Sequence, residues 1–297
     1  MKSGFIGLVG RPNVGKSTLL NAIIGHKVAI TSDKPQTTRN VIQGIRTDED
    51  SQMVFVDTPG IHKPKNKLGR ILNKEAYYSL EDVDVVLFLV DITEPLGKGD
   101  MFVIDVLKKV EVPVILVINK IDKLPKEEIL KKIDQYKDLY NFDEIVPISA
   151  RKMDNVDRLI TVLKSKLTDN IKYYDEDMYT DKPVNFMVSE LIREKILELT
   201  FEEVPHSVSV ITDSMEYGRD SVNIKATIVV DRENLKRILV GKNGTMIKKI
   251  GTRARMDIEP FLGRKVYLEL FVKVIPKWRD REKFLNEIGY EEFNFDK

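Results

Sequence analysis

The stretch VGRPNVGKSTLLN, residues 9–21, places a glycine-rich turn between two apolar segments. The run before it, residues 5–9, has the length and composition of a buried strand, and the apolar side chains of residues 19–24 have helical spacing. A turn between a strand and a helix leaves backbone N–H groups unpaired at the helix N-terminus, where they can bind an anion. Residues 10–17, GRPNVGKS, fit the phosphate-loop pattern G-x-x-x-x-G-K-[ST] in full, so we expect a phosphate-binding turn here.

Three more polar motifs directly follow apolar runs that are typical of strands. They are DTPG at 57–60, NKID at 119–122 and SAR at 149–151. Each motif alone is a weak signal, because short polar turns after strands are common. Four motifs in this order, each at the carboxyl end of an expected strand, indicate a nucleotide-binding site.

The side chains in these motifs suit a guanine nucleotide. The carboxylate of Asp57 can hold Mg²⁺, usually through water, and the N–H of Gly60 can approach a γ-phosphate with no side chain in the way. Asp122 can accept hydrogen bonds from the N1–H and the exocyclic amine of guanine, whereas adenine offers the wrong pattern at that edge. Residues 149–151 come within reach of the same base.

The first half of the chain alternates apolar runs with helix-like stretches. The expected strands are 5–9, 41–47, 52–56, 83–90, 112–118 and 145–148, and the expected later helices are 67–80, 98–109, 126–136 and 155–167. Continuous β-branched runs are typical of strands that are buried on both faces. We therefore expect an α/β fold with a doubly wound, mostly parallel sheet and its chemistry at the carboxyl ends of the strands.

The composition is that of a soluble globular protein. A length of 297 residues leaves room for about two domains, and the 42% hydrophobic and 32% charged residues argue against disorder. The absence of cysteine excludes a disulfide framework, a thiolate metal site and a cysteine nucleophile. The three histidines lack metal-ligand spacing. No apolar run has the length of a signal peptide or a membrane span, so we expect an intracellular, cytoplasmic protein.

The net charge of +1 conceals an uneven distribution. Residues 232–281 contain fourteen Lys and Arg against five Asp and Glu, which gives this segment a net charge of +9 and the rest of the chain −8. A basic segment on an acidic background favours a localised contact with a polyanion. A solvated charged face is the alternative.

A change in pattern marks the second half. Residues 170–181, NIKYYDEDMYTD, are acidic and tyrosine-rich without a clear period, and Lys182-Pro183 ends them, so we interpret 170–183 as a linker. Beyond it the expected order is α-β-β-α-α-β. The elements are a helix at 184–199, a hairpin of strands at 207–212 and 221–230, helices at 232–239 and 245–259, and a strand at 265–274.

The tetrapeptide GKNG, residues 241–244, joins two of these expected helices in the basic segment. Two helices joined by a tight G-x-x-G loop are the device with which KH domains clamp single-stranded nucleic acid. Its glycines permit close approach to the sugar–phosphate chain, and a lysine neutralises it. The RNA-binding residues expected here are Gly241, Lys242, Asn243, Gly244, Lys248, Lys249 and Arg253. Trp278 either stacks on a base or anchors the C-terminal segment on the core.

These motifs and their order resemble the Era family of bacterial ribosome-associated GTPases, within the translation-factor-related P-loop GTPases. The resemblance extends from Phe5 to about Arg281 and is carried by GRPNVGKSTLLN, PQTTR, DTPG, NKID and SAR. It implies a P-loop GTPase domain followed by an α+β type II KH domain. It also implies that Lys16 binds the β- and γ-phosphates, that Ser17 coordinates Mg²⁺ and that Thr38 is the switch-one ligand to Mg²⁺ and the γ-phosphate.

The residues expected to form the nucleotide site come from the same motifs, with the neighbouring Thr37 as the open alternative to Thr38. Catalysis is expected from Lys16, Thr38, Asp57 and Gly60, and Mg²⁺ binding from Ser17, Thr38 and Asp57. GTP or GDP is expected to contact Gly10, Arg11, Pro12, Asn13, Val14, Gly15, Lys16, Ser17, Thr18, Asp57, Thr58, Pro59, Gly60, Ile61, Asn119, Lys120, Asp122, Ser149, Ala150 and Arg151.

Two positions bear on the hydrolysis mechanism. Many small GTPases use a glutamine after the D-x-x-G glycine to orient the attacking water. Ile61 occupies that position and cannot hydrogen-bond, so we expect slow intrinsic turnover. The resemblance implies that Asn13 can ligate K⁺ beside the phosphates, and a role in shaping the loop is the alternative.

We therefore expect a GTP-driven switch that binds single-stranded RNA. The resemblance implies the 3′ end of 16S ribosomal RNA as the partner, in small-subunit assembly and rRNA maturation, and peripheral membrane association. We expect a monomer with a GTPase domain at 1–169, the linker at 170–183, a KH domain at 184–281 and a tail at 282–297. The alternatives are a nucleotide-dependent metabolic enzyme, a tRNA-modification GTPase, whose relatives rely on a C-terminal cysteine, and a constitutive RNA-binding protein with a vestigial G domain.

Overall fold

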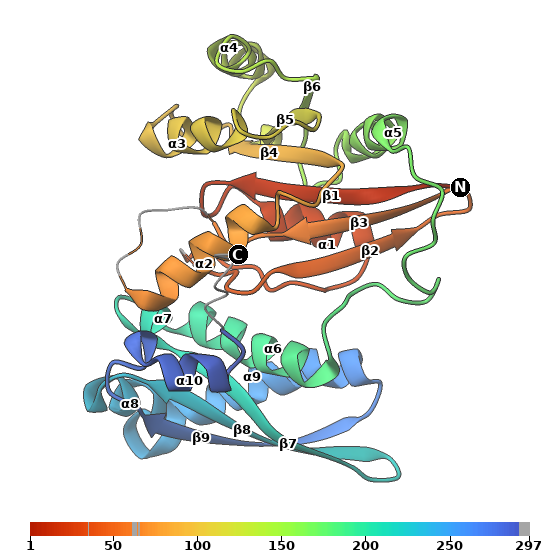
Figure 1. The fold of residues 1–297 in the computed structure, drawn as a ribbon. Helices are drawn as coiled ribbons and strands as arrows, with labels where there is room; N and C mark the ends of the chain where they lie inside the picture. The colour runs from red at the N-terminus through yellow and green to blue at the C-terminus, as the bar shows by residue number, and fades with distance from the viewer. Residues whose placement is uncertain (35, 61–63, 65, 291–297) are drawn as a thin grey trace. The chain divides into compact units, whose positions relative to one another are not determined.

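The structure is a computed structural model that describes residues 1–34, 36–60, 64 and 66–290. The chain forms two compact units with a boundary between Asp181 and Lys182, and short segments that start at Ser32 and Pro64 group with the second unit. Each unit is built on its own sheet (Figure 1).

The first unit contains a six-stranded sheet in the order β2-β3-β1-β4-β5-β6. Neighbouring strands are parallel, except that β2 and β3 pair antiparallel. The strands are β1 (Lys2–Gly10), β2 (Ile42–Thr47), β3 (Ser51–Asp57), β4 (Val85–Asp91), β5 (Val114–Asn119) and β6 (Glu144–Pro147). The helices are α1 (Lys16–Ile24), α2 (Lys67–Tyr78), α3 (Lys98–Leu107), α4 (Lys126–Tyr136) and α5 (Val156–Lys166), and of α2 only the part from Leu72 onward groups with this unit. This architecture confirms the doubly wound, mostly parallel α/β sheet expected from the sequence.

The central strands of this sheet are buried along their whole length. Every residue of β4 and β5 is buried. On one face of the sheet their side chains form one cluster with Ala76 of α2, Val103 and Ile104 of α3, and Tyr136 of α4. Strands buried in this way have apolar side chains on both faces, which explains their continuous β-branched runs.

The first strand is longer than its apolar pattern indicates. It begins at Lys2 rather than at Phe5, because residues 2–4 pair in register with residues 51–53 of β3. The carboxyl end of this strand is Gly10, so the sheet delivers the chain directly to the glycine-rich turn before α1.

Residues 179–181, at the end of the segment interpreted above as part of a linker, lie along the edge strand β2. The backbone N–H of Ile45 donates to the carbonyl of Tyr179 at 3.0 Å, and the N–H of Gln43 donates to the carboxylate of Asp181 at 2.9 Å. The ring of Tyr179 also stacks on His26, with centroids 4.4 Å apart. These contacts cover an edge that would otherwise present unpaired backbone groups.

The second unit combines helices with a three-stranded sheet in the order β7-β8-β9. Strands β7 and β8 are antiparallel, whereas β8 and β9 are parallel. The elements are α6 (Val184–Leu199), α7 (Val204–Ser207), β7 (Ser209–Tyr217), β8 (Ser221–Val230), α8 (Glu233–Val240), α9 (Thr245–Leu262), β9 (Lys265–Val274) and α10 (Glu282–Glu287). Apart from the short α7 and α10, this is the expected α-β-β-α-α-β order.

The hairpin was placed too early by the sequence pattern. The expected strand at 207–212 starts at Ser209, because the chain first makes the four-residue helix α7 with Pro205 in its first turn. Strand β7 then continues to Tyr217, because it pairs with β8 as far as Val222.

Trp278 anchors the C-terminal segment and does not present its ring for base stacking. Its side chain is fully buried, its indole N–H donates to the carbonyl of Ser207 at 2.9 Å, and its ring meets Phe284 of α10 edge to face. The base-stacking alternative for Trp278 is therefore wrong. None of the described helices combines the length and apolarity needed to cross a bilayer.

Candidate functional site

The glycine-rich turn between β1 and α1 has the backbone geometry of an anion site. Gly15 has a φ of +103°, and a Cβ added there would collide with the amide of Asn119. A Cβ on Gly10 would collide with the carbonyl of Leu89. No side chain in the described part of the chain caps the N-terminus of α1. Its first N–H groups therefore face the turn, where an anion can accept from them.

Lys16 points its ammonium group back into this turn. Its side chain is buried, and Nζ donates to the carbonyls of Gly10 and Arg11, each at 3.4 Å. Burial lowers the pKa of Lys16, and the nearby carboxylate of Asp57 opposes that effect. A buried ammonium with two long hydrogen bonds is well placed to exchange them for stronger bonds to phosphate oxygens.

Three oxygen-bearing side chains meet beside Lys16. The hydroxyl of Ser17 donates to Asp57 Oδ2 at 2.6 Å, and Ser17 Oγ lies 2.8 Å from Thr38 Oγ1. Thr38 Oγ1 is 3.5 Å from the same carboxylate oxygen. Thr38, rather than Thr37, thus supplies the hydroxyl that reaches this cluster.

The buried carboxylate of Asp57 has the environment of a metal ligand. The residue is fully buried, and within the described part of the chain its Oδ1 has no hydrogen-bond partner. Burial raises the pKa of Asp57, against the opposing influence of Lys16 and the two hydroxyls. A hard cation that prefers oxygen ligands, such as Mg²⁺, would complete the coordination of this group.

The rest of the DTPG motif packs the strand end against the phosphate loop. The buried hydroxyl of Thr58 donates to the carbonyl of Leu8 at 2.8 Å, and Pro59 is also buried. A Cβ on Gly60 would lie 3.0 Å from Pro12, so only glycine fits without displacing the loop. Ile61, which is expected to occupy the usual glutamine position, lies outside the described residues.

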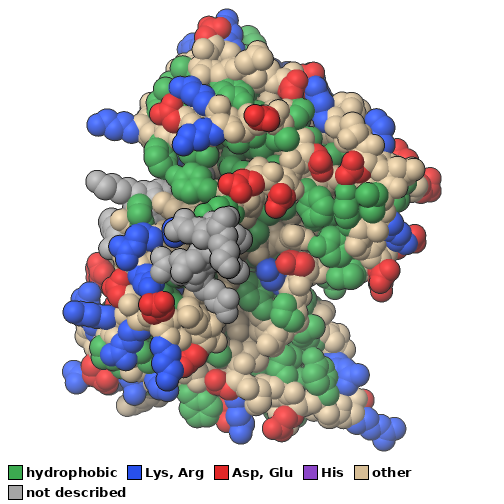
Figure 2. All heavy atoms as spheres, in the orientation of Figure 1, with side chains coloured by type: hydrophobic (Ala, Val, Ile, Leu, Met, Phe, Trp, Pro, Cys, Tyr) green, Lys and Arg blue, Asp and Glu red, His purple; other side chains and the backbone are tan. Residues whose placement is uncertain are grey.

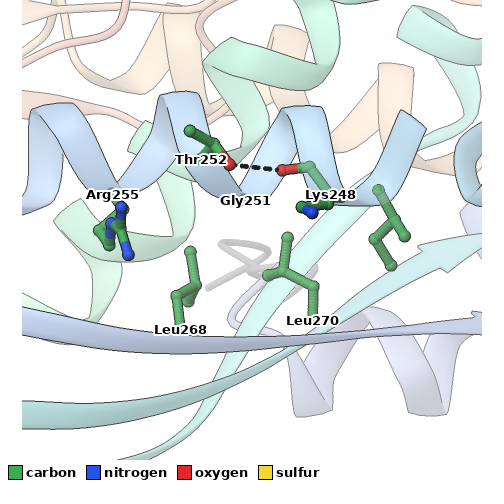
Figure 3. A pocket seen from close by; sticks show the side chains of 7 residues that line it. Lys248, Gly251, Thr252, Arg255, Leu268 and Leu270 are labelled. Atoms are coloured by element: carbon green, nitrogen blue, oxygen red, sulfur yellow. Dashed lines mark hydrogen bonds between the residues drawn. The ribbon is translucent and has the colours of Figure 1, made fainter. Parts of the chain in front are cut away.

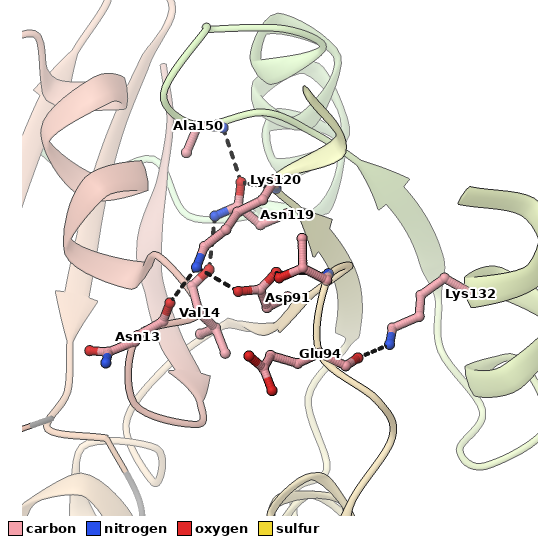
Figure 4. A network of polar contacts seen from close by, with 9 residues as sticks. Asn13, Val14, Asp91, Glu94, Asn119, Lys120, Lys132 and Ala150 are labelled. Carbon is pink, nitrogen blue, oxygen red and sulfur yellow. Dashed lines mark hydrogen bonds and ion pairs between the residues drawn. The ribbon is translucent and has the colours of Figure 1, made fainter. Parts of the chain in front are cut away.

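The NKID and SAR motifs form a pocket at the neighbouring strand ends, and Figure 4 shows the hydrogen bonds that Asn119 makes beside it. The side-chain amide of Asn119 connects the phosphate loop, the NKID motif and the SAR motif. Its Nδ2 donates to Val14 O at 2.9 Å, and its Oδ1 accepts from the N–H groups of Lys120 and Ala150. Beside it lies a pocket of about 200 Å³. The pocket is lined by Gly15, Thr18, Asn119, Lys120, Asp122, Lys123, Ala150 and Arg151.

Asp122 faces this pocket as a charged hydrogen-bond acceptor. Ser149 donates its hydroxyl to Asp122 Oδ1 at 2.7 Å, which orients the carboxylate. That hydrogen bond is the main reason why the pKa of Asp122 lies below the usual carboxyl range. A carboxylate fixed in this way can accept two parallel N–H donors from a base edge.

The side chain of Arg11 turns away from the loop. Its Nη1 lies 3.1 Å from Asp100 Oδ2 at the start of α3. Asn13 has a φ of +65°, and its carbonyl accepts from Lys120 Nζ at 2.8 Å. The structure therefore gathers the four predicted motifs along one edge of the sheet, with the guanidinium of Arg11 engaged by a carboxylate.

The G-x-x-G segment forms a tight turn between α8 and α9 in the second unit. Gly241, Asn243 and Gly244 all have positive φ values, of 73°, 53° and 75°. A Cβ on Gly241 would lie 2.8 Å from both the N and the Cβ of Met246, so a side chain there would clash. Lys242 and Asn243 are exposed at the tip. The turn therefore presents a bare backbone with one ammonium group.

A groove of about 280 Å³ runs between α9 and β9 (Figure 3). Leu268 and Leu270 of β9 form its apolar side, and Lys248 and Arg255 lie at its edge on α9. The other lining residues are Ile247, Gly251 and Thr252. Figure 2 shows Lys and Arg side chains, mixed with Asp and Glu, on the face of this unit that carries α8 and α10.

Of the predicted basic residues, only Lys248 lines the groove. Lys249 and Arg253 are exposed on other faces of α9. Sequence reasoning did not include Arg255 among the site residues. Its position seven residues after Lys248 places both on one helix face, and this spacing could have identified it.

Comparisons with known proteins agree with this arrangement. The family model for 50S ribosome-binding GTPases matches residues 5–120, and the model for KH domains matches residues 203–279. Two similar solved structures are Aquifex aeolicus Era, as a variant bound to GDP and AlF₄⁻, and Era in complex with MgGDPNP and nucleotides 1506–1542 of 16S ribosomal RNA. Each is 44% identical to this chain with a TM-score of 0.95, over 98% of this chain and 100% of the other.

This similarity extends through both units and confirms the resemblance, the GTPase and KH fold classes, and the guanine-nucleotide and Mg²⁺ chemistry expected from the motifs. The protein is a GTP-hydrolysing enzyme with an RNA-binding domain. With this identity across nearly the full length, the chain belongs to the Era family of GTPases.

Proposed function

We propose that this GTPase binds the 3′ end of 16S ribosomal RNA through its second unit and acts in small-subunit assembly and rRNA maturation. The observation that carries the proposal is the full-length similarity to an Era structure that holds MgGDPNP and nucleotides 1506–1542 of 16S RNA together. The family model that matches the first unit is named for binding to the 50S ribosomal subunit. That model covers only residues 5–120, so it does not include the RNA-binding unit. The tRNA-modification and vestigial-domain alternatives are not favoured.

In the proposed nucleotide site, the turn at residues 10–17 and Lys16 hold the phosphates. The N–H groups at the start of α1 and the Lys16 ammonium neutralise the β- and γ-phosphates. Ser17, Thr38 and Asp57 would hold Mg²⁺, which neutralises charge between the same phosphates when bound. Gly60 would donate its N–H to the γ-phosphate. This assignment is supported by the three converging oxygens and by Asp57 Oδ1, which has no hydrogen-bond partner among the described residues.

Guanine selectivity is assigned to Asp122. The hydrogen bond from Ser149 orients its carboxylate and lowers its pKa below the ordinary carboxyl value. Guanine offers two N–H donors to such an acceptor, and adenine does not. Asn119 serves as the brace that joins the base pocket to the phosphate loop.

RNA binding is assigned to the turn at Gly241–Gly244 and to the groove between α9 and β9. The bare turn admits the sugar–phosphate backbone close to the protein, and Lys242 and Lys248 neutralise it. The apolar side of the groove accepts unstacked bases, which a duplex cannot supply. On this assignment the GTPase domain is 1–169, the linker 170–183, the KH domain 184–281 and the tail 282–297.

Three finer properties stay predictions. These are a K⁺ ion held by Asn13, a monomeric state, and a cytoplasmic location with peripheral membrane association. The K⁺ ion and the membrane association are implied by the family resemblance.

The RNA assignment is tested with the full chain and a fluorescently labelled strand of 16S nucleotides 1506–1542. The double variant Lys242→Asp/Asn243→Asp places two carboxylates against phosphates, so we expect binding to weaken by well over tenfold. GDP affinity should stay unchanged. The matched control, Lys131→Asp/Gln135→Asp, makes the same change in net charge on exposed positions of α4 and should bind RNA normally.

The salt dependence provides a second readout. Each neutralised phosphate contributes a slope of about −0.7 to the log–log plot of affinity against salt for single strands, so the double variant should show a shallower slope. Unchanged RNA binding in the double variant would remove the assignment of the turn.

A further inference from the structure

Two buried carboxylates lie just outside the residues assigned to the nucleotide. Asp91 ends β4 and Asp100 is in the first turn of α3, so both belong to one connection of the first unit. Their relative exposures are only 7% and 2%. Neither residue belongs to one of the four nucleotide-binding motifs. Asp91 makes an ion pair with Lys120 of the NKID motif, and Asp100 makes one with Arg11 of the phosphate loop.

Asp91 holds the ammonium group of Lys120. Asp91 Oδ2 lies 2.5 Å from Lys120 Nζ, and the same Nζ donates to Asn13 O at 2.8 Å (Figure 4). The other carboxylate oxygen accepts from both the N–H and the hydroxyl of Thr93, at 2.9 and 2.7 Å. Lys120 is therefore fixed between a buried carboxylate and the backbone of the phosphate loop.

Asp100 holds the same loop at a second point. Its Oδ2 accepts from Arg11 Nη1 at 3.1 Å and from the N–H of Gly97 at 2.9 Å. The stem of Arg11 rests on Gly99, where an added Cβ would lie 3.1 Å from it. The guanidinium is thereby committed to α3 rather than to a bound phosphate.

We propose that Asp91 and Asp100 are positioning residues that hold the phosphate loop through Lys120 and Arg11, and so limit how fast a nucleotide leaves. The inference rests on the nucleotide site proposed above. A buried carboxylate that loses its cation is left uncompensated in a low-dielectric environment, so each pair strongly disfavours separation. The loop can open for release only if these pairs separate or strain, because they join Arg11 and Asn13 to the β4–α3 connection.

The first test measures release of a fluorescent GDP analogue, mant-GDP, from the full-length Asp91→Asn variant. Asparagine keeps an oxygen for Thr93 but turns an NH₂ donor toward the Lys120 ammonium. Loss of a charge-assisted hydrogen bond leads us to expect release roughly tenfold faster than from the unmodified chain. Single-turnover hydrolysis of bound GTP should change by less than about twofold, because the groups around the γ-phosphate are untouched.

Four further variants separate positioning from general loss of structure. If Asp91 acts through Lys120, adding Asp91→Asn to Lys120→Met should accelerate release no further than Lys120→Met alone. Arg11→Gln removes the ion pair between Arg11 and Asp100 by changing its partly exposed partner, and it should accelerate release of mant-GDP several-fold. Asp105→Asn, which breaks an exposed ion pair with Lys108 on α3, is the matched control and should release at the normal rate.

The outcomes distinguish this inference from the proposed site. If the unmodified chain fails to bind mant-GDP, the proposed nucleotide site is wrong. If it binds, but Asp91→Asn and Arg11→Gln release at the normal rate, the positioning role is overturned. Additive effects of Asp91→Asn and Lys120→Met would also overturn it. If Asp91→Asn does not fold, Arg11→Gln decides, and normal release from that variant counts against the proposal.

Discussion

Replacing Asp122 by asparagine should convert the base pocket from guanine to xanthine preference. In the structure one carboxylate oxygen of Asp122 accepts from Ser149 at 2.7 Å, and the side chain lines the pocket beside Asn119. Guanine presents two N–H donors to this carboxylate. Asparagine turns one acceptor into a donor, which then faces a donor on guanine but an acceptor on xanthine.

The magnitude follows from the hydrogen bonds that change. Loss of a charge-assisted hydrogen bond, together with a donor left facing a donor, should cost about 3 kcal/mol, which is roughly two orders of magnitude in Kd. The loss should be confined to the base, because the phosphate-binding residues are unchanged. XTP should therefore bind the variant more tightly than GTP does.

Competition against mant-GDP measures this change. Increasing concentrations of GTP, XTP and ATP are added to the unmodified chain and to the Asp122→Asn variant, and the displaced fluorescence gives each Kd. Equal GTP and ATP affinities in the unmodified chain would refute the assignment of Asp122. Unchanged preference for GTP over XTP in the variant would refute it equally.

Two other predictions concern hydrolysis. GTP hydrolysis should be faster in K⁺ than in Na⁺ at equal ionic strength, and Asn13→Ala should abolish the difference; equal rates in both salts would leave Asn13 a loop-shaping residue only. Asp57→Asn should raise the Mg²⁺ concentration needed for half-maximal hydrolysis by at least about tenfold, since it removes the buried charge beside Ser17 and Thr38. An unchanged Mg²⁺ titration would remove Asp57 from the metal site.

The helices and strands were predictable where the spacing of apolar residues in the sequence matches the face that packs on the core. Helix α6 and strands β8 and β9 have the expected bounds, because one face or stripe of each packs on the core of the second unit. The strands β4 and β5 were predictable for the opposite reason, since they are apolar throughout and buried throughout.

Contacts made by the backbone or between distant residues could not be predicted. The pairing of residues 179–181 with β2 uses backbone groups such as Ile45 N–H and Tyr179 C=O, which leave no pattern in side chains. The burial of Trp278 could not be predicted, because its indole N–H donates to the carbonyl of Ser207, 71 residues away in the sequence. On α6, the Glu190–Arg193 ion pair is buried, although charged residues usually mark the exposed face of a helix.

The candidate site was predictable to the extent that its chemistry lies in contiguous motifs. Ser17, Thr38 and Asp57 are far apart in the sequence, yet each belongs to a motif with a fixed place at a strand end. Asp91 and Asp100 were not predicted, because a single aspartate after a strand or in a first helical turn has many ordinary explanations. Only the distances to Lys120 and Arg11 distinguish them.

We propose that the bound nucleotide controls RNA binding, so that the two units act together as one switch. The most direct test measures the Kd of labelled 16S nucleotides 1506–1542 for the full chain saturated with MgGDPNP and with GDP. RNA should bind more tightly with MgGDPNP than with GDP, by about fivefold or more, and linkage requires RNA to increase the preference for MgGDPNP over GDP by the same factor. Equal RNA affinities in the two nucleotide states would contradict the claim, because the two units would then act independently.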